Sequence, residues 1–241
     1  MEPASYSISA LSTSIARGES SAESVARDML QRCEQNRSLN ALIAQDPERV
    51  IAAAKAADRW QEAGKPLGPL HGVPIIVKDN IDVLGYRTTA GTPGLIGVCP
   101  DSNAPVVQRL LDAGAIVAGK ANLHELAVGG TSQNEHFGHV VNPWRAKVVA
   151  GGSSGGSAVA VAARLIPGAL GTDTNGSVRG PCAMNGITGL RPSFHRYPYG
   201  GILPSTPTRD SVGGMTTTMA SPYPARRGAG RRTGATIGRY P

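Results

Sequence analysis

The segment GGSSGGS at positions 151–157 consists only of glycine and serine, and serine acts as a nucleophile or a proton relay in several classes of enzyme. A stretch of this composition serves as a phosphate-binding loop, as the nucleophile elbow of a hydrolase, as the carrier of a relay serine, or as a flexible linker. The residues around the segment distinguish these four interpretations.

Two of the four interpretations fit the following residues poorly. A phosphate-binding loop places a lysine after its last glycine, and Ser157 stands at that position. A linker precedes polar sequence without periodicity, whereas the run AVAVAARLI follows at once. This run is apolar on every side except at Arg164, and it predicts a buried helix that Pro167 terminates. A linker therefore remains only a minor alternative.

The nucleophile elbow remains an alternative, because Gly151, Ser153 and Gly155 satisfy the pattern G-x-S-x-G and the preceding KVVA could form the required strand. His195 would then be the catalytic base, since it is the only histidine after Ser153. It follows Ser153 by 42 residues, with Asp173 between them. That interval is short for the strands and helices that an α/β-hydrolase places there.

A longer segment, GGSSGGSAVAVAARLIPGALGTDTNGSVRGP, resembles the amidase signature family, in which a glycine–serine loop, a helix, a strand and a D-T-G-G-S turn follow one another. The resemblance includes LHGVPIIVKDNIDVLGYRTTAGTPGL upstream and covers most of the chain. The phrases NLHELAVGGTSQN and RYPYGGILPSTPTRDSVG are most similar to the indoleacetamide hydrolase branch. The resemblance implies hydrolysis of a primary amide, such as indole-3-acetamide, to a carboxylate and ammonia.

The resemblance also implies a catalytic triad of Lys78, Ser153 and Ser177. Ser177 is implied to be the nucleophile, and Ser153 is implied to relay a proton from a position after a cis peptide bond. Free lysine has a pKa near 10.4, but Lys78 follows the apolar run PIIV, where burial is expected to lower that pKa. Taken alone, the dipeptide of Lys78 and Asp79 is more typical of a solvated surface pair.

The turn that ends in Ser177 is implied to stabilise the oxyanion of the tetrahedral intermediate through backbone N–H groups. The implied donors are Thr174, Asn175, Gly176 and Ser177. Asn175 departs from the family pattern, which has glycine there, and asparagine tolerates unusual backbone angles better than most residues. The residues expected to support the two loops without reacting are Gly151, Gly152, Ser154, Gly155, Gly156, Asp173 and Arg179.

No metal or organic cofactor is expected. Four histidines lack the spacing of metal ligands, and we interpret them as polar or packing residues: His124, His136, His139 and His195. The three cysteines are odd in number and show no C-x-x-C spacing, which argues against a disulfide framework or a zinc site and favours a reduced, cytoplasmic location: Cys33, Cys99 and Cys182.

The elements that must position these residues follow from capping and periodicity. Ser20 and Glu23 have capping-box spacing before an amphipathic run, and Asp46 with Pro47 opens a second predicted helix that ends at Gly64. From residue 66 onward, short β-branched runs such as PIIV and AIVAG alternate with helical segments. The sequence therefore predicts an α/β fold with a mixed central sheet flanked by helices.

We expect a helical N-terminal region at 1–65, an amidase-like core at 66–220 and a disordered tail at 221–241. The tail holds five of the seven net positive charges in its arginines, so the core gives little reason to expect a nucleic-acid partner. The sequence shows neither a run of 18 apolar residues nor the pattern of a signal peptide, so we expect no membrane partner. A small-molecule amide is the expected partner, and a homo-oligomer remains open.

The family resemblance stops near DSVGGMTTTMA, whereas family members usually continue well beyond this point. We therefore expect a C-terminally truncated relative whose fold is incomplete on that side. Two alternatives to an active amidase follow: a catalytically incompetent relative, and the amidase component of a tRNA-dependent amidotransferase.

Overall fold

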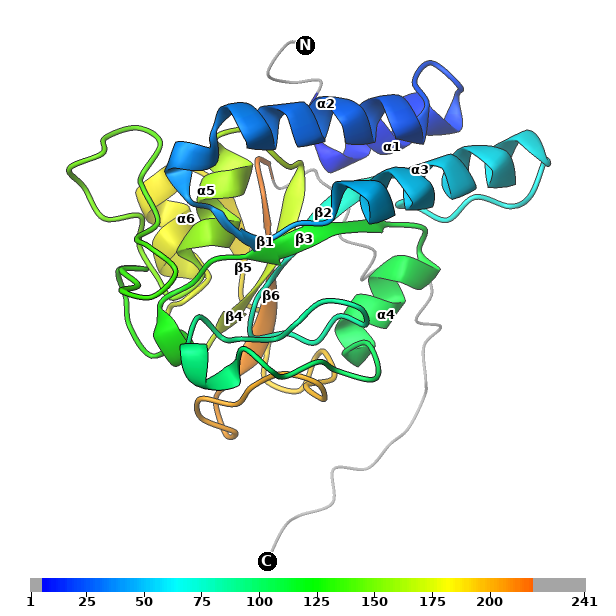
Figure 1. Cartoon of the computed structure of the whole chain (residues 1–241). Coiled ribbons are helices and arrows are strands. Elements are labelled where there is room, and N and C mark those ends of the chain that lie inside the picture. The colour runs from blue at the N-terminus through cyan, green and yellow to red at the C-terminus, as the bar shows by residue number, and fades with distance from the viewer. Residues whose placement is uncertain (1–5, 219–241) are drawn as a thin grey trace, which may run out of the picture.

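The computed structural model describes residues 6–218, which form a mixed α/β fold around one six-stranded sheet (Figure 1). The strands are β1 (Leu42–Ala44), β2 (Pro74–Lys78), β3 (Ile116–Ala121), β4 (Gly168–Asp173), β5 (Thr188–Leu190) and β6 (Ser211–Thr216). The helices are α1 (Ile8–Ala16), α2 (Ala22–Gln35), α3 (Pro47–Glu62), α4 (Pro105–Asp112), α5 (Gly155–Ala162) and α6 (Arg179–Asn185). Short 3-10 helices are η2 (Arg37–Leu39), η3 (Pro93–Leu95) and η4 (Glu125–Ala127).

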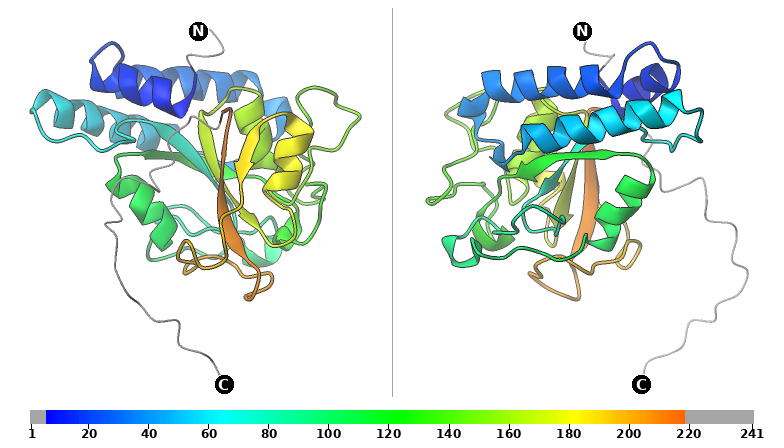
Figure 2. Two further views of the ribbon diagram at one scale, coloured as in Figure 1. Left: turned by 180° about the vertical axis from the view of Figure 1, so that it is seen from behind. Right: turned by 45° about the vertical axis from the view of Figure 1, so that its right-hand side comes forward.

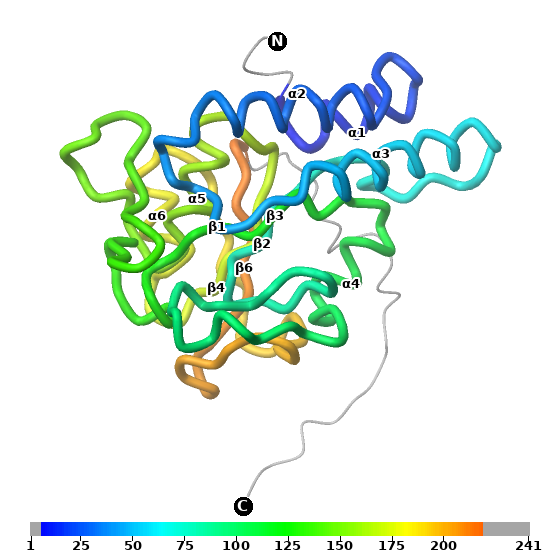
Figure 3. Tube along the Cα trace, in the orientation of Figure 1, coloured from blue at the N-terminus to red at the C-terminus, as the bar shows by residue number. Residues whose placement is uncertain are grey.

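The sheet has the strand order β1-β3-β2-β4-β6-β5. Its central strand β2 runs parallel to β3 and β4, whereas β1 is antiparallel to β3, and β6 is antiparallel to both β4 and β5. The tube in Figure 3 shows β2 and β4, which are far apart in the sequence, at the centre of the molecule. The predicted mixed sheet flanked by helices is thus confirmed.

Capping explains where the N-terminal helices begin. The Ser21 hydroxyl accepts the N–H of Ser24 and caps α2, so the cap lies one residue later than predicted. The Asp46 carboxylate accepts the N–H of Arg49 and caps α3, which begins at Pro47 as predicted. The N-terminal region also contributes strand β1, which the helical prediction for 1–65 did not include. The predicted tail at 221–241 lies outside the described residues.

Side chains of the central strands alternate between two apolar clusters, as the period of a strand requires. Ile76 packs in one cluster with residues of α2, α3, α5 and α6, whereas Ile75 and Val77 pack in the other with residues of α1 and α4. Figure 2 shows the helices on both sides of the sheet in two further views. Within residues 6–218 no helix is long and apolar enough to cross a bilayer.

The buried helix predicted after the glycine–serine segment is confirmed as α5, all of whose residues are buried. It ends at Ala162, before the predicted stop at Pro167, and Arg164 adopts a left-handed φ of +60° just beyond it. The helix leads into β4, which ends at Asp173. The chain therefore carries the glycine–serine segment to one end of α5 and the DTNGS turn to the C-terminal end of a central strand.

Candidate active site

Lys78 is the last residue of β2, and its side chain is completely buried. Its Nζ lies 2.7 Å from Ser153 Oγ and 2.8 Å from Thr172 Oγ1. Burial lowers the pKa of Lys78 to about 7, against the opposing effect of the negative charges of Asp173 and Asp210. A large fraction of this amine is therefore neutral near pH 7 and has a lone pair that can accept a proton.

The structure excludes a solvated surface pair of Lys78 and Asp79, because both side chains are buried. Asp79 instead pairs with Lys120 on the neighbouring strand β3, with 2.9 Å between Oδ1 and Nζ. The other carboxylate oxygen accepts the N–H of Thr89 at 3.0 Å. Asp79 thus binds Lys120 and Thr89 beside the end of β2, and the amine of Lys78 contacts Ser153 and Thr172 instead.

The glycine–serine segment approaches other backbone so closely that side chains would not fit at several positions. The peptide bond between Gly152 and Ser153 is cis. A Cβ atom on Gly152 would lie 2.8 Å from the backbone nitrogen of Ser132, and one on Gly156 would lie 2.3 Å from the carbonyl oxygen of Asn122. The Ser153 carbonyl accepts the N–H of His124 at 3.1 Å. These contacts hold the backbone of Ser153 beside Lys78.

Ser154 connects the glycine–serine segment to the predicted nucleophile. Its backbone N–H donates to the carbonyl oxygen of Ser177 at 3.2 Å, and its hydroxyl donates to the carbonyl oxygen of Thr172. The structure thereby brings together Lys78, Ser153 and Ser177, although they come from three separate segments. Within residues 6–218, no hydrogen bond joins the hydroxyl groups of Ser153 and Ser177.

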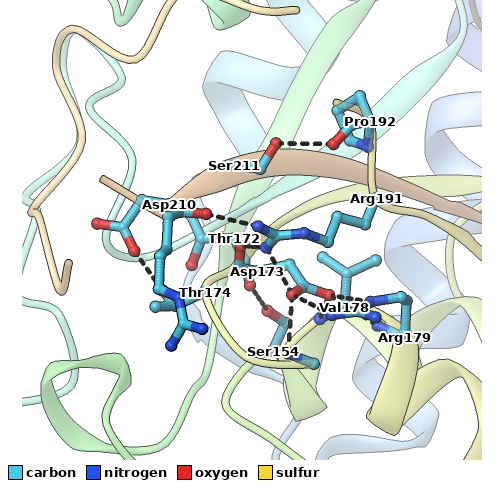
Figure 4. A network of polar contacts seen from close by, with 12 residues as sticks. Ser154, Thr172, Asp173, Thr174, Val178, Arg179, Arg191, Pro192, Asp210 and Ser211 are labelled. Carbon is cyan, nitrogen blue, oxygen red and sulfur yellow. Dashed lines mark hydrogen bonds and ion pairs between the residues drawn. The ribbon is translucent and has the colours of Figure 1, made fainter. Parts of the chain in front are cut away.

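The turn before Ser177 is organised around the buried carboxylate of Asp173 (Figure 4). This carboxylate accepts the N–H groups of Gly176 at 2.8 Å and Val178 at 3.1 Å, and it binds the guanidinium groups of Arg179 and Arg191. Burial alone would raise the pKa of Asp173, but the hydrogen bonds from Arg179 and the backbone hold it well below its usual range. Asp173 is therefore a permanent anion within the turn.

Three of the four predicted oxyanion donors keep free N–H groups. Gly176 donates its N–H to Asp173 Oδ1, which removes it from the available donors in this structure. Within the described part of the chain, the N–H groups of Thr174, Asn175 and Ser177 make no hydrogen bond. Unengaged backbone N–H groups in a fixed turn can stabilise a developing negative charge on a substrate oxygen.

Four residues near these groups were not singled out from the sequence: Asn80, Thr172, Arg191 and Asp210. Thr172 contacts the Lys78 amine directly, and Asn80 donates its amide to Thr172 Oγ1 at 3.2 Å. Thr172 and Lys78 lie near the C-terminal ends of neighbouring parallel strands, where functional groups of α/β sheets commonly converge. That placement is the one signal in the sequence that could have indicated Thr172.

The histidines do not form an alternative site. His195, the base required by the nucleophile elbow, is exposed, and its ring contacts that of Phe194 at an angle of 45°, whereas the Ser153 hydroxyl is bonded to Lys78. Burial lowers the pKa of His124, whose ring contacts Thr131. Among residues 6–218 no group of three or more potential metal ligands is present. The structure has three free cysteines: Cys33, Cys99 and Cys182.

A buried lysine of lowered pKa bonded to a loop serine, with a second serine in an adjacent turn, is the arrangement expected of a serine hydrolase that uses lysine as its base. The chain matches the Amidase family over residues 24–221, and it belongs to that family.

Individual relatives support this assignment. Mandelamide hydrolase of Pseudomonas putida is 50% identical over 189 residues, which are 76% of this chain and 37% of that protein. A glutamyl-tRNA(Gln) amidotransferase subunit from Cupriavidus necator is 44% identical over 209 residues, with coverages of 87% and 42%. The peptide amidase of Stenotrophomonas maltophilia superposes with a TM-score of 0.84 and 37% identity, with coverages of 88% and 45%.

The chain spans less than half the length of these relatives. This agrees with the expectation that family members continue well beyond the matched segment. The relatives establish the family and do not distinguish the indoleacetamide hydrolase branch within it.

Proposed function

We propose that this chain carries the site of an amidase that hydrolyses a primary carboxamide to a carboxylate and ammonia. The observation that carries the proposal is the contact of 2.7 Å between the Lys78 amine and the Ser153 hydroxyl, in a fully buried position where the pKa of lysine falls to about 7. A serine hydroxyl is a weak nucleophile until a base removes its proton, and a neutral lysine can supply that base.

Acylation begins when neutral Lys78 accepts the proton of Ser153 and Ser153 accepts the proton of Ser177. The Ser177 oxygen then attacks the amide carbon, and the carbonyl oxygen becomes an anion. The free N–H groups of Thr174, Asn175 and Ser177 are the donors available for this oxyanion. The proton returns from Lys78 through Ser153 to the amide nitrogen, the C–N bond breaks, and ammonia leaves an acyl-enzyme.

Deacylation uses the same residues, with water in place of Ser177 as the proton donor and nucleophile. Water gives a proton through Ser153 to Lys78 and attacks the ester carbon of the acyl-enzyme. The proton then returns to the Ser177 oxygen as the C–O bond breaks, and the carboxylic acid leaves. The complete cycle consumes one amide and one water, and it restores every protonated group to its starting form.

For the acyl group we propose an arylacetic amide, such as mandelamide or indole-3-acetamide. Two observations support this class: the phrases NLHELAVGGTSQN and RYPYGGILPSTPTRDSVG in the sequence, and the 50% identity to mandelamide hydrolase. The 44% identity to an amidotransferase component favours, as a second candidate, the amidase component of a tRNA-dependent amidotransferase. Such a component would co-purify with partner proteins, which an amidase acting alone would not require.

The test is ammonia release from mandelamide, indole-3-acetamide and an aliphatic primary amide by the purified, folded chain. Ser177→Ala is expected to abolish release, whereas Ser153→Ala and Lys78→Ala should slow it by about 10²-fold or more because each removes part of the proton path. Ser154→Ala serves as the matched control and should have a milder effect, because its hydroxyl bonds only the Thr172 carbonyl.

Three outcomes would count against the proposal. Absence of turnover by a well-folded chain with all three amides would favour a catalytically incompetent relative. Equal activity in the Lys78, Ser153 and Ser177 variants would exclude the triad. Loss of activity in Ser153→Ala together with full activity in Ser177→Ala would favour the nucleophile elbow.

A further inference from the structure

Asp210 is a buried residue whose carboxylate accepts several hydrogen bonds, and only 3% of its surface is exposed. Its Oδ1 accepts the hydroxyl of Thr174, and its Oδ2 accepts the N–H groups of Ser205 and Thr206, each at 2.8 Å. Figure 4 shows Asp210 beside Thr174, on the opposite side of the turn from Arg179. Asp210 thus connects the segment 205–210 to the first residue of the turn 174–177.

The sheet explains why Asp210 stands at this point. Strands β4 and β6 are antiparallel, and their last paired residues are Asp173 and Ser211. Asp210 precedes β6 and Thr174 follows β4, so the two residues continue the same register just beyond the ladder. The end of the ladder therefore places Asp210 opposite Thr174.

The turn 174–177 is held at its two ends by different carboxylates. Asp173 binds the second half of the turn through the N–H of Gly176 and continues to Val178. Asp210 binds the first half through the Thr174 hydroxyl. The first half contains two of the three free N–H groups, those of Thr174 and Asn175. The orientation of these two groups therefore depends on the contact with Asp210.

The segment that ends in Asp210 also contacts the end of the lysine strand. The N–H of Leu203 donates to the carbonyl oxygen of Asn80 at 2.9 Å, and the N–H of Asp82 donates to that of Gly201 at 2.8 Å. Arg191 adds a second connection, because its guanidinium bonds both the Asp173 carboxylate and the carbonyl oxygen of Arg209. Residues 201–210 thus join the region of Lys78 to the turn of Ser177.

We propose that Asp210 is a positioning residue of the active site, which holds Thr174 so that the N–H groups of the first half of the turn face the substrate oxygen. This inference rests on the proposed amide hydrolysis and extends it to a residue outside the triad. Oxyanion donors are effective because they are oriented before the charge develops, and a turn free to rotate loses part of that advantage.

Two variants interrupt the contact from opposite sides. Thr174→Val removes the hydroxyl with almost no change of volume, and Asp210→Asn turns an amide NH₂ toward groups that are themselves donors. Each is expected to reduce kcat by about tenfold to a hundredfold, less than the 10²–10³ that follows complete removal of an oxyanion donor, with KM within about threefold of wild type. Thr174→Ser restores the hydroxyl and should recover most of the kcat lost in Thr174→Val.

A double-mutant cycle separates positioning from a general structural effect. If Asp210 acts through Thr174, the double variant loses no more kcat than the more severe single variant. Thr208→Val, at an exposed position of the same segment, is the matched control and should behave as wild type. Three results would overturn the proposal: additive losses of kcat in the double variant, a change confined to KM, or wild-type kcat in Thr174→Val. In each of these cases a reaction that still depends on Ser177 would leave the proposed function standing.

If the chain hydrolyses none of the tested amides, the positioning role of Asp210 can still be tested by a measurement that needs no substrate. Backbone ¹⁵N relaxation of Thr174 and Asn175 should report increased motion on the picosecond-to-nanosecond scale in Asp210→Asn, with Gly176 unchanged because Asp173 still binds it. Unchanged relaxation at Thr174 and Asn175 would overturn the positioning role by itself. Failure of the proposed function and failure of this inference are thus distinguished.

Discussion

The protonation state of Lys78 can be tested through folding, without any substrate. Replacement by methionine keeps an unbranched side chain of similar length and removes the ionisable group. In the folded chain the pKa of Lys78 is lowered from 10.5 to about 7 by burial, whereas in the unfolded chain the amine is exposed to water. The two states therefore bind different numbers of protons between about pH 7 and 10.5.

The sign of the effect follows from this difference. Between pH 7 and 10.5 the unfolded wild-type chain holds a proton that the folded chain has released, so the free energy of unfolding rises with pH. Below about pH 7 both states are protonated, and the destabilisation due to burial is complete. Lys78→Met has no such contribution. From pH 7.5 to 9.5 the wild type should gain about 2 to 3 kcal/mol relative to the variant.

The assay is urea unfolding of both chains at a series of pH values, followed by circular dichroism. The measured quantity is the difference in the free energy of unfolding between wild type and Lys78→Met. Lys147→Met, which removes an exposed lysine, is the matched control and should give a difference that does not change with pH. A constant difference for Lys78→Met as well would mean that the folded state keeps the proton, and Lys78 could not be the base.

The same pKa sets the expected pH dependence of catalysis. Neutral Lys78 is the active form, so kcat/KM should rise with pH through one ionisation with a midpoint of about 7. At pH 6 about one tenth of the enzyme would be in the active form. A flat profile between pH 6 and 8 in an active enzyme would contradict this assignment.

Two further substitutions test the surroundings of the lysine and the glycine loop. Thr172→Val removes an acceptor that favours the charged amine, so the midpoint of the pH profile of kcat/KM should move below that of wild type. Thr172→Ser keeps the acceptor and should keep the midpoint. An unchanged midpoint in Thr172→Val would contradict the role of Thr172. Gly156→Ala places Cβ 2.3 Å and 2.4 Å from two backbone carbonyl oxygens. It should lower the free energy of unfolding, measured in urea, by about 3 kcal/mol or more. Gly180→Ala is the control and should be tolerated, because its Cβ would lie 4.0 Å from the nearest atom, the carbonyl oxygen of Gly152.

The sequence predicted those parts of the fold whose local signals agree with their tertiary environment. Strands β2 and β3 come from β-branched runs, and α3 begins at an Asp-Pro pair that both caps and starts a helix. Strand β6 was missed because its segment SVGGMT has little β-propensity. A Cβ on Gly213 would lie 2.4 Å from the carbonyl oxygen of Leu190, so the strand depends on close pairing with β5 rather than on its own residues.

The residues of the candidate site likewise divide into those that local sequence predicts and those that it does not. Lys78 and Ser153 lie within extended motifs, and the structure places them in contact. Thr172 and Asp210 reach their partners only through the sheet: 94 residues separate Thr172 from Lys78, and 36 separate Asp210 from Thr174. Periodicity and local motifs do not report such pairings, because they depend on which strands become neighbours.

The pairing of β2 with β4 also contributes to the environment that lowers the pKa of Lys78. The partners of the Lys78 amine, Ser153 and Thr172, follow it by 75 and 94 residues, so the environment that lowers its pKa forms only when these distant segments pack against β2. In the unfolded chain, water surrounds the amine and keeps it protonated at neutral pH. Folding therefore releases about one proton from this amine between neutral pH and the pKa of a free lysine, and an indicator dye in a weakly buffered refolding reaction would record when the lysine becomes buried.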